Sequence, residues 1–153
     1  YQEVELGKQR IGLSLWDFGG EMQFRDFIPV FCLGAHAAIV VFDLSRYSTF
    51  RCLTGWLDLI IPEEKNIPII LVGSKSDLDC GGPSEEEVQK LCEKYKISEY
   101  ITVSSLTGEN ITQLFKRISE LIIEAVKEGE ITPAKPFKIH GQGRETEPSC
   151  DAE

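Results

Sequence analysis

Apolar residues along this chain recur at two spacings, one typical of strands and the other of helices. Near the amino terminus, YQEVEL and RIGLSLW flank a Gly-Lys turn, and Ile11, Leu13 and Leu15 fall on one face, which predicts a β-hairpin. Later apolar runs are nearly continuous, as in strands that are covered on both faces. The strands are predicted at 1–6, 10–16, 37–42, 67–72 and 100–104.

Helical spacing appears in three segments between and after these strands. Residues 50–61 carry apolar side chains close to every third or fourth position, and 83–97 contain Ser84 and Glu87 three residues apart, which predicts a capping box. The segment 111–127 has the most regular apolar stripe. Its members are Ile111, Leu114, Phe115, Ile118, Leu121, Ile122, Ala125 and Val126.

Strands that alternate with helices predict an α/β layered fold with a mostly parallel sheet. In such sheets ligands bind at the carboxyl ends of the strands, so the segments there are the first place to look for chemistry. After Gly129 the chain becomes polar and gains prolines. We therefore expect a domain over residues 1–128 and a flexible polar tail over 129–153.

Composition narrows the possible partners and the cellular compartment. With 42% hydrophobic residues, the 153-residue chain fits one globular domain, and its net charge of -9 argues against binding nucleic acid or an anionic membrane. The apolar runs are too short to span a bilayer. Five cysteines without a C-x-x-C pair suggest neither disulfides nor zinc. We expect a soluble cytoplasmic protein.

Three strands end in polar segments whose order and spacing are informative: WDFGG at 16–20, GSKSDLD at 73–79 and SSLTGEN at 104–110. Together they resemble the nucleotide-binding motifs of small Ras-like GTPases, most of all those of the Rab and Ras branches. The Phe-Gly-Gly form of the first motif is similar to that of archaeal members of the superfamily. The likeness covers residues 3 to about 127. It implies a three-layer αβα sheet of the P-loop GTPase type, with GTP or GDP and Mg²⁺ as ligands.

The resemblance assigns roles to particular residues. Asp17 matches an aspartate that holds magnesium through a water, and Gly20 a glycine whose amide donates to the γ-phosphate. Asp77 matches the acid that accepts two N–H groups of guanine, which selects guanine over adenine. Lys75 matches a lysine whose stem lies against the base, and Ser105 a residue whose amide meets the guanine oxygen.

Some positions in these motifs depart from the family pattern. Ser74 replaces an asparagine and is too short to reach both base and phosphate loop, while Leu106, two residues after Ser104 in the third nucleotide-binding motif, replaces a lysine over the base. Glu21 replaces the glutamine that orients the attacking water. Two like charges 4 Å apart cost about 4 kcal/mol at a surface-like dielectric, so we expect slow intrinsic hydrolysis.

The phosphate loop motif G-x-x-x-x-G-K-[ST] does not occur in these residues, and Tyr1 is not a start methionine. By resemblance, the sequence starts at the family's second strand and lacks the first strand, phosphate loop and first helix. We therefore expect an amino-terminal truncation that binds nucleotide poorly by itself. The missing strand would lie between 10–16 and 37–43, so both of those strands should have an unpaired edge.

Alternative interpretations remain open at this stage. The chain is either a hydrolytic switch that engages effectors, exchange factors and activating proteins as a monomer, or a non-catalytic interaction module with the same fold. A flavodoxin-like receiver would use Asp43 as phospho-acceptor, although a turn-capping role is the simpler interpretation. His36 and His140 lack companion metal ligands, and Cys150 in CDAE does not form a prenylation signal.

Overall fold

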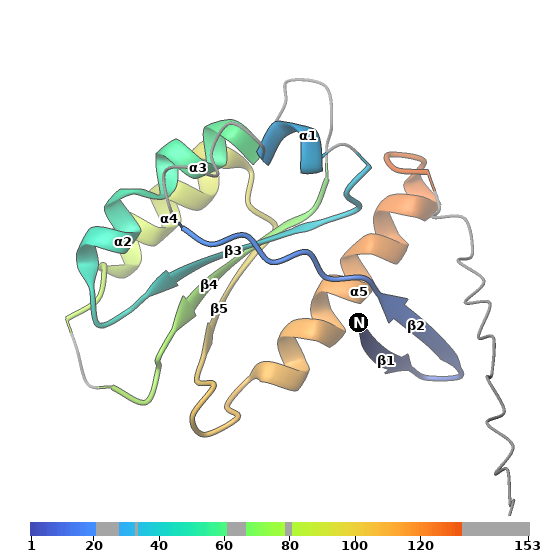
Figure 1. The fold of residues 1–153 in the computed structure, drawn as a ribbon, viewed down its shortest axis with the longest axis horizontal. Helices are drawn as coiled ribbons and strands as arrows, with labels where there is room; N and C mark the ends of the chain where they lie inside the picture. Colours follow the sequence, from blue (N-terminus) through green and yellow to red (C-terminus); the bar gives the residue numbers. More distant parts are fainter. Residues whose placement is uncertain (21–27, 33, 61–66, 79–80, 133–153) are drawn as a thin grey trace, which may run out of the picture.

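The structure is a computed structural model that describes residues 1–20, 28–32, 34–60, 67–78 and 81–132. β1 (Gln2–Leu6) and β2 (Gln9–Leu13) form an antiparallel hairpin, as the sequence predicts. β3 (Ala38–Asp43), β4 (Ile69–Ser74) and β5 (Glu99–Val103) form a parallel sheet in the order β3-β4-β5. Figure 1 shows the three parallel strands running through the middle of the domain.

Helices cover both faces of the parallel sheet. α2 (Tyr47–Arg51), α3 (Leu53–Ile60) and α4 (Glu85–Tyr95) lie on one face, with the short α1 (Ile28–Cys32) beside α3. α5 (Ile111–Glu128) lies on the other face together with the hairpin (Figure 1). The predicted three-layer α/β arrangement with a mostly parallel sheet is confirmed.

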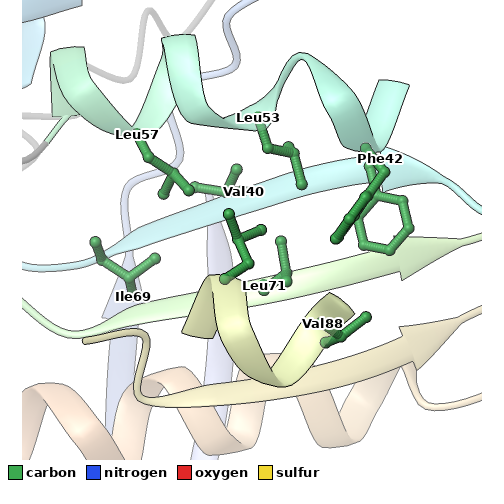
Figure 2. Close-up of a cluster of buried hydrophobic side chains, with 9 residues drawn as sticks. Val40, Phe42, Leu53, Leu57, Ile69, Leu71 and Val88 are labelled. Carbon is green, nitrogen blue, oxygen red and sulfur yellow. The ribbon is translucent and has the colours of Figure 1, made fainter. Parts of the chain in front are cut away.

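β4 is buried on both faces, and its alternate residues build two separate cores. Ile69 and Leu71 belong to the core under α3 and α4, where Leu57 of α3 is completely buried. Figure 2 shows these side chains meeting between the helices and the strands. Ile70 and Val72 point to the opposite core, which α5 closes. Successive side chains of a strand point to opposite faces, so the apolar run of β4 contributes residues to the cores on both faces of the sheet.

α5 matches its sequence prediction closely. Leu114 and Ile118 are buried against the sheet, and four further members of the apolar stripe pack around them: Ile111, Phe115, Leu121 and Ile122. The helix ends at Gly129, which has a left-handed backbone with φ 77°. The predicted capping box of α4 is also present, because Ser84 and Glu87 exchange side-chain to backbone hydrogen bonds.

Some predicted boundaries are wrong. β2 ends at Leu13, three residues before the predicted end, and Leu15 and Trp16 are exposed. The helix predicted over 50–61 is two helices that meet at Cys52, and α1 was not predicted. Most of the predicted tail, residues 133–153, lies outside the described residues.

The hairpin and the parallel sheet are two separate sheets. Among the described residues, β2 pairs only with β1, and β3 only with β4. The amides of Ala38 and Leu44 donate toward β4, to the carbonyls of Pro68 and Ser74 at 3.0 Å each. The opposite edge of β3 therefore has no strand partner in the part of the chain that the structure describes.

Candidate functional site

The two polar segments that follow β4 and β5 lie side by side at the carboxyl edge of the sheet. They meet because these strands pair in parallel, with Ser74 opposite Val103. The Ser76 amide donates to the Val103 carbonyl at 3.0 Å, and the Ser76 hydroxyl donates to Oε2 of Glu109 at 2.7 Å. Two segments that are about thirty residues apart in sequence are thereby joined.

Asp77 is held in this junction by a buried serine. Ser104 is completely buried, and its hydroxyl donates to the carboxylate of Asp77 while accepting from the Thr107 amide at 3.1 Å. Asp77 itself is exposed. A carboxylate oxygen has more than one lone pair, so the group keeps free acceptor positions that face solvent.

The segment after β5 is a tight backbone turn. The Ser104 amide donates to the Glu109 carbonyl at 3.2 Å, and the Gly108 amide donates to the Ser104 carbonyl at 2.9 Å. Gly108 has φ 82°, a conformation that favours glycine. The turn leaves Ser105 exposed and Leu106 84% exposed, next to the Asp77 segment.

Ser74 and Lys75 are tied to the end of β3. The Ser74 hydroxyl donates to the Phe42 carbonyl at 2.8 Å, so its short side chain is used within the sheet. Lys75 has a left-handed backbone with φ 63°, and its Nζ lies 2.7 Å from Oδ2 of Asp43. The lysine is thus paired with a carboxylate, and its stem lies across the ends of two strands.

Asp43 makes a contact at this edge that sequence reasoning missed, the ion pair with Lys75. Its carboxylate accepts from the amide and hydroxyl of Ser45 at 2.9 and 2.6 Å, which confirms the predicted turn-capping role. The ammonium of Lys75, followed by the hydroxyl of Ser45, holds the pKa of Asp43 well below its ordinary value. The available signal was its position: like Asp77, it stands where a parallel strand ends.

The predicted phosphate and metal residues belong to another part of the chain, the segment after β2. Asp17 and Gly20 lie in an exposed stretch after β2, and Glu21 lies outside the described residues. A Cβ atom at Gly20 would meet nothing within 4 Å, so packing among the described residues does not require a glycine there. Within the described ranges no three His, Cys, Asp or Glu side chains gather into a metal site.

A groove of about 310 Å³ lies at the opposite edge of the sheet, where β4 begins. Ile69, Tyr95 and Leu121 are among the residues that line it, and Glu124 and Glu128 stand at its side. Among the predicted site residues that the structure describes, none lines this groove. The candidate site is therefore defined by the strand-end segments.

In the described parts of the chain, none of the helices has the length and apolar character needed to cross a membrane.

A mostly parallel α/β sheet with an anchored aspartate at its carboxyl edge is what the resemblance to small Ras-like GTPases predicts. Comparison with protein families agrees: residues 1–124 match the Ras family, and the chain belongs to that family.

Relatives carry Rab-type names. The chain is 30% identical over 134 residues to "Ras-related protein Rab-4A" of Rattus norvegicus, which covers 86% of this chain and 61% of the relative. It is 35% identical over 134 residues to "GTP-binding protein ypt4" of Schizosaccharomyces pombe, covering 85% and 57%. The chain thus spans about three fifths of the length of these curated relatives.

Proposed function

We propose that the protein is a molecular switch that binds GTP and GDP with Mg²⁺ and hydrolyses GTP. The observation that carries this proposal is the exposed carboxylate of Asp77, oriented by the completely buried hydroxyl of Ser104. A carboxylate that is fixed in this way can accept two guanine N–H groups at once. Adenine presents a different donor pattern, so the same geometry selects guanine.

The neighbouring residues complete a base pocket. The stem of Lys75 lies against one side of the base, the amide of Ser105 donates to the guanine oxygen, and Leu106 gives an apolar cover. Family membership and the exposure of Ser105 and Leu106 support this arrangement. Orientation of a base by few polar groups and apolar walls is typical of small-molecule sites.

The phosphate end rests on the segment after β2. Gly20 offers a backbone amide to the γ-phosphate without a side chain in the way, and Asp17 holds magnesium through a water. These 153 residues contain no G-x-x-x-x-G-K-[ST] motif, whose amides and lysine supply most of the grip on phosphates. We therefore propose that they bind nucleotide weakly when tested alone.

Hydrolysis should be slow. Glu21 stands where a glutamine would orient water, and a carboxylate can accept from that water but repels the phosphate. A partner that supplies an arginine, or a raised glutamate pKa, would offset this repulsion. The switch segment would run from Asp17 to about residue 26 and change its order with the γ-phosphate.

Single-turnover hydrolysis of GTP by the whole protein tests the enzymatic part of the proposal. We expect slow, magnesium-dependent release of phosphate, which becomes faster in Glu21→Gln because the charge repulsion is removed. Glu86→Gln, on the exposed surface of α4, is a matched control that removes one carboxylate elsewhere. If GTP binds tightly but phosphate release stays at background in wild type and in Glu21→Gln, the enzymatic part fails.

A non-catalytic interaction module is the second candidate. It is favoured by Ser74, whose hydroxyl donates to the Phe42 carbonyl within the sheet instead of reaching toward a ligand. Trp16 is 74% exposed beside Phe18, in the segment that would respond to nucleotide. In either case we propose protein effectors and regulators as partners, which family membership supports, with residues 1–128 as the domain of a cytoplasmic monomer.

A further inference from the structure

Asp43, at the end of β3, has a buried carboxylate that accepts hydrogen bonds from four donor groups. The residue is 7% exposed, and besides Ser45 it accepts from Nε of Arg46 at 3.2 Å and from Nζ of Lys75 at 2.7 Å. Three of these donors come from the turn that directly follows the strand. The fourth, Lys75, comes from the end of the neighbouring strand.

Lys75 adopts a backbone conformation that brings its side chain to this carboxylate. Its φ of 63° is rare for residues other than glycine. The same turn lets the Lys75 carbonyl accept from the Leu78 amide at 3.1 Å, so Asp77 lies within one closed turn that starts at Lys75. The lysine side chain is half exposed while its partner is buried, so the ammonium is anchored and part of the side chain remains accessible to solvent.

Anchoring matters because a free lysine has many rotamers. Placing its stem against a ligand restricts them, at a cost of roughly 0.5–1.5 kcal/mol, which corresponds to about two- to tenfold in affinity. An ion pair that already exists in the free protein removes much of this cost. The exposed ion pair of Lys90 with Glu86, on α4, has both partners in solvent and no such role.

We propose that Asp43 is a positioning residue of the nucleotide site: it holds the ammonium of Lys75 so that the lysine stem lies ready beside Asp77. The inference rests on the proposed function for its ligand, and on the structure for the contact. Asp43 acts through Lys75 and does not itself touch the nucleotide.

Equilibrium binding of fluorescent GDP to the whole protein tests this inference through a double-mutant cycle. Asp43→Asn keeps the acceptor for the Ser45 amide and removes the charge that holds Lys75. Lys75→Met keeps the stem, removes the ammonium and leaves Asp43 intact. We expect each variant to weaken GDP binding about two- to tenfold, and the double variant to be no weaker than the singles.

Two results would overturn the inference. The first is unchanged affinity in Asp43→Asn, and the second is a loss in the double variant that equals the product of the two single losses. Glu86→Gln, which breaks the exposed pair on α4, should leave GDP binding unchanged. Thermal unfolding shows whether each variant is folded. If Asp43→Asn does not fold, Lys75→Met, which leaves Asp43 intact, is the variant whose GDP affinity is interpreted.

A second readout needs no nucleotide. The acetylation rate of Lys75, followed by mass spectrometry under limiting reagent, should rise in Asp43→Asn, while that of Lys90 should stay constant. Equal Lys75 rates in wild type and variant would also overturn the inference. Slow acetylation in a wild-type protein that binds no GDP would instead refute the proposed function and leave the Asp43–Lys75 anchor standing.

Discussion

Replacing Ser104 with alanine should destabilise the protein, although the change removes a single oxygen atom. The hydroxyl is completely buried, donates to the Asp77 carboxylate and accepts from the Thr107 amide at 3.1 Å. A neutral hydrogen bond contributes about 1 kcal/mol net, and one to a charged group about 1.5–3 kcal/mol. Because Asp77 is exposed and water can replace the lost donor, we take the lower end and expect about 2 kcal/mol.

Ser119 provides a matched control within the same chain. It is also completely buried, and its hydroxyl donates to the Phe115 carbonyl at 2.8 Å inside α5. That carbonyl keeps its ordinary helical partner when the hydroxyl is removed, and alanine has the higher helix propensity. Ser119→Ala should therefore change stability by less than about 0.5 kcal/mol.

Urea unfolding of the two variants, with equal m-values as the condition for comparison, measures the difference. We expect a clear fall in the midpoint for Ser104→Ala and almost none for Ser119→Ala. Guanine-nucleotide affinity should also fall in Ser104→Ala, since Asp77 loses its anchor. A Ser104→Ala variant as stable as Ser119→Ala would refute the reasoning that the buried hydroxyl holds the two segments together.

Three further predictions concern the core, a helix cap and acid stability. Leu57→Ala should cost about 2–5 kcal/mol in urea unfolding, since Leu57 is completely buried, and a loss under 1 kcal/mol would contradict the packing described here. Ser84→Ala should cost about 1 kcal/mol by removing the α4 cap, and unchanged stability would show that the capping box contributes nothing. The lowered pKa of Asp43 means that its stabilisation is complete above about pH 4, the ordinary range of an aspartate, and is lost as the pH falls toward the folded-state value. Stability measured against pH should therefore fall less steeply below pH 4 in Asp43→Asn, and parallel curves would contradict this assignment.

Periodicity predicted the parts of the fold whose packing is uniform along their length. α5 keeps one face against the sheet for all of its turns, so an apolar stripe in the sequence was sufficient. Periodicity failed where the packing around a segment changes along its length, or where the segment is too short to show a period. Leu15 continues the alternation of β2 but has no core above it, and α1 is five residues long, too short to show a period.

The candidate site was predictable as far as strand order allowed. The rule that ligands bind where parallel strands end pointed to the segments that contain Asp77 and Ser104, and the resemblance to Ras-like GTPases marked them as nucleotide-binding. The partner of Lys75 was not predictable, because it depends on the left-handed backbone at Lys75 and on the register of β4 against β3. Neither of these follows from residue type.

Nucleotide selectivity tests the central claim most directly. The measurement is the affinity of the whole protein for GDP, ADP and XDP in wild type and in Asp77→Asn. The account predicts that wild type prefers GDP, and that Asp77→Asn shifts preference toward XDP because an amide pairs with the xanthine carbonyl that replaces the guanine amino group. Equal affinity for GDP and ADP in wild type, or unchanged selectivity in Asp77→Asn, would contradict it.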